Sequence, residues 1–204
     1  NYTDSYFQPL IDHLRRKENI EFLQLVQLHG DGTSLTDPRV GFPQGLRFCE
    51  EFLSLRNLCE IVLTLPWVWF SSLQSLRKRP LFLNGCDVTK VIQEELSSVF
   101  STPMIYGPLV QYFVGKNLAK RFPGSAVIYP FENLSWEKMF LRGLRSATPS
   151  PKAFGFQHSL LIPAFLPTRL AQQEWKGADL PDIIFTTGPH AASAMEEIAN
   201  YPRH

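Results

Sequence analysis

The sequence has few of the residues that build covalent or metal-held frameworks. Only three cysteines occur in 204 residues, Cys49, Cys59 and Cys86, and none belongs to a C-x-x-C pair. This spacing excludes the usual zinc and dithiol motifs, so we expect small buried thiols in a reducing compartment. No apolar run reaches about 18 residues, the length that a membrane-spanning helix needs. The formal net charge is only +1, which does not favour nucleic acid as a partner.

The familiar catalytic signatures are absent as well. The sequence has no G-x-S-x-G elbow, no phosphate-binding P-loop and no H-E-x-x-H metal motif. The "GDG" at 30–32 lacks the G-x-G-x-x-G spacing of a dinucleotide site. No clustered set of Asp and His predicts a bound metal ion. Because no secretory signal pattern is present either, we expect a cytoplasmic protein that uses neither metal nor cofactor.

Apolar residues are plentiful, and their spacing predicts an α/β domain. The chain is 44% hydrophobic, with 16 Phe and 4 Trp, which is enough for a packed core. From residue 123 onward the pattern predicts, in order, a strand at 126–130, a helix from 135, a strand at 152–157, a strand at 181–188 and a helix at 189–202. Such alternation is typical of a parallel sheet with helices on its faces. We therefore predict a Rossmann-like, three-layer α/β/α fold with a mainly parallel sheet.

The first half of the chain gives weaker signals. Helical spacing predicts helices at 4–19, at 46–65, within 81–100 after a cap at Asp87, and at 103–122, with a short strand at 20–28. Pro66 is expected to break or kink the second of these helices. The stretch 29–45 is rich in glycine and proline and predicts a long loop of the kind that is usually functional.

Polar side chains follow two of the predicted strands, at the point where each strand ends. The stretches are "VIYPFENLSWEKMF" (127–140) and "AFGFQHSLLIP" (153–163), and the polar residues that follow the strands are Glu132, Asn133, Gln157, His158 and Ser159. Ligands bind outside the carboxyl ends of the strands in an open parallel sheet. We expect Glu132 and His158 to face a common cleft at one sheet edge, where either could act as a general base.

Plainer alternatives exist for each of these residues. Glu132 or Asn133 could only cap the helix that begins near Ser135, and His158 could be a hydrogen-bonded histidine at the edge of the sheet. Beside these alternatives, the free N–H groups at that helix start could hold a carboxylate or phosphate of a ligand in the cleft. The outer side of the helix is expected to carry Glu137, Lys138, Arg142 and Arg145.

Three further candidates for ligand contacts come with similar alternatives. Lys138 is either a substrate contact or a solvated helix residue. His29 and Asp31, in the loop 29–45, are either site residues or plain turn residues.

The segment "PWVWFSSLQSLRKRP" (66–80) combines aromatic with basic residues, namely Trp67, Trp69, Phe70, Arg77, Lys78 and Arg79. This combination is found in segments that lie at a membrane surface. The alternative is that the tryptophans belong to the core and the basic cluster ends a helix in solvent. Peripheral contact with the inner face of the plasma membrane is therefore one of two interpretations.

Three stretches, taken in order, resemble a known family. They are "YPFENLSWEKMFLRGLR" (129–145), "AFGFQHSLLIP" (153–163) and "LPDIIFTTGPHAASAM" (180–195). The set is similar to bacterial surface-carbohydrate biosynthesis proteins of the O-antigen and capsule type, which are glycosyltransferases with two Rossmann domains (the glycosyltransferase-B type). More distantly, it resembles capsule polysaccharide transferases. The resemblance covers residues 123–190, roughly a third of the chain, and its motifs are more specific as a series than singly.

The resemblance implies a function that the spacing of residues does not. Such enzymes bind the acceptor mainly in the N-terminal domain and the nucleotide-sugar donor mainly in the C-terminal domain. Residues 1–188 would then form the acceptor-side domain, and 189–204 would lead to an absent C-terminal domain. Glu132 or His158 would deprotonate a hydroxyl of a glycan or lipid-linked glycan acceptor, while Asn133, Gln157 and Ser159 position the sugar.

Two other functions share these features. A nucleotide-sugar epimerase would use similar carboxylates and histidines at its strand ends. A non-catalytic module for glycan recognition or for scaffolding would need only the binding surface.

Overall fold

The computed structural model describes residues 7–18, 21–26, 46–78, 80–83, 85–100, 105–159, 169–170, 179–197 and 199–201. The chain divides into two compact units, Asn1–Phe52 and Leu53–His204, and each is described by itself. The predicted loop 29–45, with the candidates His29 and Asp31, lies outside the described residues. The predicted domain limits, 1–188 and 189–204, stay a prediction.

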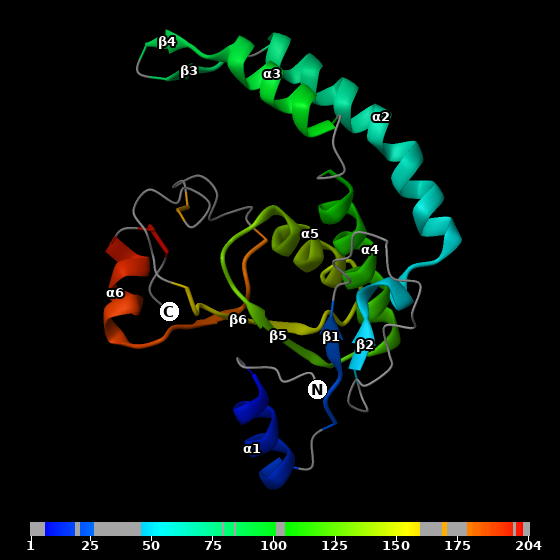
Figure 1. Ribbon diagram of the computed structural model, residues 1–204, viewed down its shortest axis with the longest axis vertical. Coiled ribbons are helices and arrows are strands. Elements are labelled where there is room, and N and C mark those ends of the chain that lie inside the picture. Colours follow the sequence, from blue (N-terminus) through cyan, green and yellow to red (C-terminus); the bar gives the residue numbers. More distant parts are fainter. Residues whose placement is uncertain are drawn as a thin grey trace, which may run out of the picture. The chain divides into compact units, whose positions relative to one another are not determined.

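The described residues of the first unit form an α-helix, a pair of strands and a short 3-10 helix. Its elements are α1 (Gln8–Glu18), β1 (Gln24–Val26), β2 (Leu46–Phe48) and the short 3-10 helix η1 (Cys49–Phe52). The two strands pair in parallel, with Gln24 opposite Leu46 and Val26 opposite Phe48. The helix predicted at 4–19 is confirmed over Gln8–Glu18, and the strand predicted at 20–28 is confirmed over Gln24–Val26 only, since residues 21–23 are not part of a strand (Figure 1).

The second unit contains a parallel sheet of three strands, β5 (Ala126–Pro130), β6 (Lys152–Phe156) and β7 (Ile183–Phe185), in that spatial order (Figure 1). Ala126 lies opposite Lys152, and Pro130 lies opposite Phe156. The helix α5 (Ser135–Leu144) connects the first two strands, and α6 (Pro189–Glu197) follows the third. The predicted alternation of strands and helices is confirmed, and the fold is of the α/β class with small parallel sheets.

The helix α5 packs on the sheet and on a second helix, α4 (Tyr106–Arg121). The Tyr129 ring of β5 meets Trp136 and Phe140 of α5 edge to face, with centroids 6.4 and 6.5 Å apart. Leu141 and Leu144 of α5 are almost completely buried, as is Val114 of α4. This packing confirms that Phe140 and Leu144 face inward, whereas Trp136 and Met139, predicted on the same face, are partly exposed.

Two glycines allow the backbones of α4 and α5 to approach closely. A Cβ atom at Gly115 would collide with the carbonyl oxygen of Phe140, and one at Gly143 would collide with the carbonyl oxygen of Tyr112. The obstacles are backbone atoms of a packed helix, so they cannot move aside as the end of a side chain can. The position of α5 on the sheet therefore depends on both glycines.

The helix α2 (Leu55–Lys78) differs from its prediction at both ends. Residues 46–52 form β2 and η1 instead, and α2 begins where the Ser54 hydroxyl accepts a 3.2 Å hydrogen bond from the Asn57 N–H. The Asn57 Oδ1 accepts the Ser54 N–H in return, at 3.0 Å, which completes a reciprocal cap. The helix then continues through Pro66, which lacks the N–H for one helical hydrogen bond, so the predicted break at this residue is wrong.

The remaining elements of the second unit follow α2. A short antiparallel hairpin, β3 (Phe82–Leu83) and β4 (Cys86–Asp87), leads into α3 (Thr89–Phe100), which lies beside α2 (Figure 1). The Asp87 carboxylate accepts the Thr89 N–H at 2.8 Å, as expected of a residue that caps this helix, and hydrogen bonds from Thr89 lower the pKa of Asp87.

The prediction that the cysteines are buried is wrong for two of the three. All three cysteines are free, but only Cys49 is buried, whereas Cys59 and Cys86 are exposed. Among the described helices, none combines the length and the apolar character needed to cross a membrane.

Replacing either close-packed glycine should destabilise the protein. We expect Gly115→Ala and Gly143→Ala each to lower the free energy of unfolding by about 2 kcal/mol or more, because the added methyl group meets backbone. The matched control is Gly107→Ala in α4, where a Cβ meets nothing within 4 Å and where alanine should be neutral or stabilise by up to about 1 kcal/mol. Urea unfolding of the three variants checks this. Equal stability of Gly115→Ala and Gly107→Ala would contradict the close approach of the helices.

Candidate functional site

The candidate site lies at the carboxyl edge of the three-stranded sheet. Backbone hydrogen bonds continue the ladder past the strand ends: the Phe131 N–H donates to the Phe156 carbonyl at 2.9 Å, and the Gln157 N–H donates to the Phe185 carbonyl at 2.8 Å. The polar residues that follow β5 and β6 are therefore held in register with each other rather than in free loops. This is the edge at which open parallel sheets bind their ligands.

Glu132 and His158 contact each other at this edge. The Glu132 Oε1 lies 3.8 Å from the His158 Nε2, and the side chains are 30% and 20% exposed. The two groups form an ion pair when the imidazole is protonated, and both remain accessible to a ligand. The prediction that these residues lie at the same sheet edge is confirmed.

Glu137 lies in a different position from the one that the helical pattern predicted. It was expected on the outer side of α5, but its side chain is only 1% exposed. Its carboxylate accepts the Glu132 N–H at 3.1 and 3.2 Å and the Asn133 N–H at 3.0 Å. The expectation failed because the helical pattern was set by the large apolar residues, although a glutamate in the first turn of a helix is a known partner for free N–H groups.

These hydrogen bonds hold a strained connection between β5 and α5. Asn133 has a φ of 59°, in the left-handed region that asparagine tolerates better than most residues. Leu134, which precedes the helix, is extended and offers no capping side chain. The Glu137 carboxylate therefore replaces the missing cap, and it fixes the backbone from which the Glu132 side chain extends.

Burial dominates the ionisation of this carboxyl group. Removal from water raises the pKa of Glu137 to about 7, above the ordinary value of 4.5. The N–H groups of Leu134, Glu132 and Asn133 act in the opposite direction, and the nearby charge of Glu132 adds a small increase. A carboxyl group whose pKa is close to neutral pH thus accepts a hydrogen bond from the backbone of Glu132, which is one member of the Glu132–His158 pair.

Gln157 and Asn133 are the two buried amides of the site, each 3% exposed. The Gln157 Nε2 donates to the backbone carbonyl of Ser159, which holds the turn after β6. Within the described part of the chain, the Gln157 Oε1 has no hydrogen-bond partner, and a buried acceptor left in this state costs stability unless a water or ligand hydroxyl donates to it.

The remaining described candidates, Ser159 and Lys138, are close in sequence to His158 and Glu137. Ser159 is partly exposed and belongs to the same turn as His158, and Lys138 is partly exposed on α5 beside Glu137. Thr186, which is not among the site residues predicted from the sequence, follows β7 at the same edge and donates a 3.2 Å hydrogen bond to the Gly188 carbonyl. Its signal was the predicted strand end at 181–188, where polar residues again follow an apolar run.

The two arginines expected on the outer side of α5 make contacts away from this edge. Arg142 pairs with Asp179 at 2.9 Å, and Arg145 lies 3.7 Å from Asp182. Asp182 precedes β7 and accepts the Ala153 N–H near the start of β6, so these ion pairs tie the end of α5 to the amino end of the sheet. Their role is structural.

Among the described residues, no three His, Cys, Asp or Glu side chains gather in a way that could hold a metal ion. Comparison with known proteins found no match to a family model, to a curated protein or to a solved structure.

The raised pKa of Glu137 predicts a particular dependence of stability on pH. The folded protein binds the carboxyl proton more tightly than the unfolded chain, so this contribution is fully present below pH 4.5 and is lost as the pH rises through about 7. The loss amounts to about 3 kcal/mol, since each pH unit between the two pKa values is worth about 1.4 kcal/mol. Urea unfolding of the wild type and of Glu137→Gln across this pH range measures this loss: the free energy of unfolding of the wild type, relative to that of the variant, should fall as the pH rises. If the wild type instead became more stable relative to the variant with rising pH, the raised pKa would be contradicted.

Proposed function

We propose that the chain is the acceptor-side domain of a glycosyltransferase that extends a bacterial surface polysaccharide. The observation that carries the proposal is the contact of Glu132 with His158 at the carboxyl edge of a parallel sheet. The ordered resemblance over 123–190 supports the same class of enzyme. In the proposed protein the sheet belongs to a Rossmann-like three-layer domain, and a second such domain binds the nucleotide-sugar.

The proposed chemistry needs one proton acceptor beside the sugar hydroxyl. His158 takes the proton of the acceptor hydroxyl as its oxygen forms a bond to the anomeric carbon of the donor sugar. The bond from that carbon to the nucleoside diphosphate breaks, and the leaving phosphate oxygen takes the bonding electrons. The Glu132 carboxylate, 3.8 Å from the Nε2, stabilises the imidazolium that forms.

Neighbouring groups supply the contacts that orient a sugar. The buried Gln157 Oε1 can accept a hydrogen bond from a sugar hydroxyl, and Ser159 and Asn133 lie in the adjoining turns. A site that satisfies a buried acceptor with a ligand hydroxyl discriminates strongly against a ligand that lacks the hydroxyl. Lys138, and the loop residues His29 and Asp31, remain proposed contacts of the acceptor or of the donor phosphates.

The proposal predicts a loss of turnover in variants of the pair. In the enzyme with both domains, Glu132→Gln and His158→Ala should each lower kcat by about a hundredfold or more. The double variant should be little worse than either single variant, because residues that act as a unit are not additive. Nucleoside diphosphate release from UDP-, GDP- and dTDP-sugars in the presence of acceptor glycan measures this. Glu94→Gln, an exposed carboxylate on α3, is the matched control.

The other outcomes of this assay identify the alternatives. Near-normal turnover in both single variants would overturn the catalytic role and leave Glu132 and His158 as structural residues. Unchanged glycan binding without any transfer would indicate a recognition module, and conversion of a nucleotide-sugar without acceptor would indicate an epimerase.

A separate experiment tests the proposal that this chain binds the acceptor and a second domain binds the donor. Because the donor contacts are placed in the second domain, the 204-residue chain alone should bind glycan but transfer no sugar. Sugar transfer by this chain alone from any of the nucleotide-sugars would contradict the two-domain arrangement.

A further inference from the structure

The helix α2 presents an exposed apolar face. Its members are the large exposed apolar residues of the helix: Leu55, Leu58, Val62, Leu63, Trp67, Trp69 and Phe70. Leu63 is 77% exposed, Trp67 is 69% exposed and Phe70 is 62% exposed. At roughly 100° per residue these seven positions occupy one half of the helix, while Asn57 and Ile61 on the other half are buried. The interpretation that the two tryptophans belong to the core is therefore wrong.

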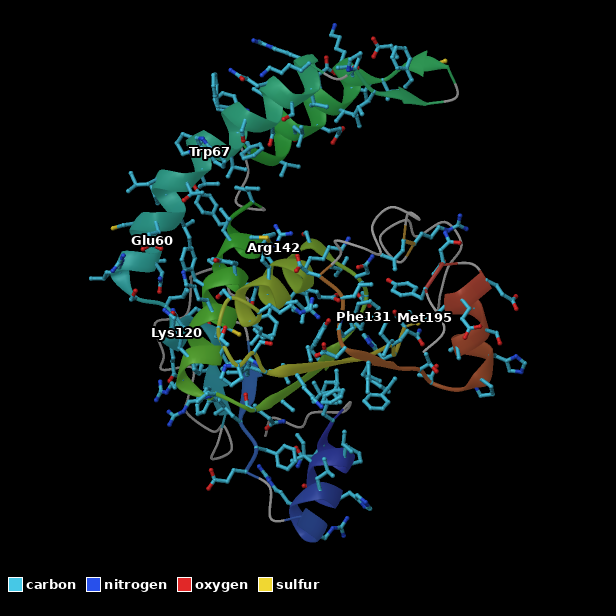
Figure 2. All side chains as sticks on the ribbon, turned by 180° about the vertical axis from the view of Figure 1, so that it is seen from behind. Glu60, Trp67, Lys120, Phe131, Arg142 and Met195 are labelled. Carbon is cyan, nitrogen blue, oxygen red and sulfur yellow. The ribbon has the colours of Figure 1, made fainter. Side chains whose placement is uncertain are left out.

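The helices α4 and α3 contact α2, and its buried residues Asn57 and Ile61 lie opposite the apolar face. The Asn117 side chain of α4 donates a 2.9 Å hydrogen bond to Asn57, and α3 packs along the later part of the helix. Figure 2 shows the side chains along α2, with Glu60 and Trp67 labelled. The apolar face is thus exposed at the surface. A group of large exposed apolar side chains of this kind usually marks a site of interaction with a partner or a membrane.

The charges at the carboxyl end of this face have one sign, whereas the first part of the helix carries the Arg56–Glu60 pair. No charged residue occurs from Ile61 to Leu76, and the helix then ends on Arg77 and Lys78, both exposed. Between Glu60 and Asp87 the sequence contains no acidic residue. The apolar face therefore adjoins a purely basic helix end.

We infer that the apolar face of α2 lies on an anionic membrane surface. Tryptophan and phenylalanine insert at the level of the lipid headgroups, and lysine and arginine at the edge of the inserted segment pair with anionic lipid. The uncharged stretch is about 24 Å long at 1.5 Å per residue, which suits a helix lying in the interface and is short of a spanning one. The inference is independent of the proposed transfer reaction, because it concerns a different surface.

Vesicle binding of the full chain tests the inference. The chain should sediment with vesicles of phosphatidylcholine and phosphatidylglycerol, weakly with phosphatidylcholine alone, and less as salt is added. The double variant Arg77→Gln/Lys78→Gln should bind about thirtyfold more weakly, since each cation near an anionic surface contributes roughly a factor of five. The matched control is Lys120→Gln/Arg121→Gln, which removes the same charge from the exposed end of α4 and should bind as the wild type does.

A second measurement reports on the apolar face itself. Brominated lipid should quench tryptophan fluorescence of the wild type, and the quenching should be lost in Trp67→Phe/Trp69→Phe while binding persists. Binding should fall in Trp67→Ser/Phe70→Ser and be unchanged in Leu10→Ser, an exposed apolar position on α1.

Three results would overturn the inference. They are no vesicle binding at low salt, equal binding by the two charge variants, and a dimer of the chain that dissociates in Trp67→Ser/Phe70→Ser without any vesicle binding. The last result would assign the face to contact between two copies.

Discussion

The site depends on one interaction, the hydrogen bonds from the Glu132 and Asn133 N–H groups to the buried carboxylate of Glu137. The chain leaves β5, turns through a left-handed Asn133 and enters α5 without a capping side chain at Leu134. Two N–H groups in this turn would otherwise be shielded from water without a partner, at a cost of roughly 1–3 kcal/mol each. Because Glu137 accepts both, the backbone at Glu132 has one conformation, and its side chain meets His158.

The Glu137 carboxylate can accept these hydrogen bonds only because α5 itself is held in position. Gly115 and Gly143 let α4 pack against the backbone of α5, and Tyr129 of β5 packs against the Phe140 ring of the same helix. A buried carboxyl group whose pKa is near 7 is costly to ionise, so it persists only where the surrounding packing and its N–H donors hold it in place. The order of dependence runs from the two glycines to α5, then to Glu137, and finally to the Glu132–His158 pair.

The sequence predicted the parts of this arrangement that local patterns encode. Apolar runs ending in Glu132 and His158 predicted parallel strands with polar ends, and right-handed crossovers put those ends side by side. Glu137 was missed because its burial follows from a tertiary turn that a helical pattern does not contain, and its usual signal, a Ser or Thr three residues earlier, is replaced by Leu134. The start of α2 was missed because it is set by the Ser54–Asn57 cap and by the contact of Asn57 with Asn117, and the second of these is a tertiary contact that a helical pattern does not contain. His29 and Asp31 lie outside the described residues and remain predictions.

Amide hydrogen exchange of the turn tests the central claim most directly. In the wild type, the Glu132 and Asn133 amides should exchange slowly, because both donate to Glu137. In Glu137→Ala they should exchange at least about tenfold faster, while the Phe131 amide, which donates to Phe156 in the sheet ladder, keeps its rate and controls for general loosening. Unchanged exchange at Glu132 and Asn133 in the variant would contradict the account.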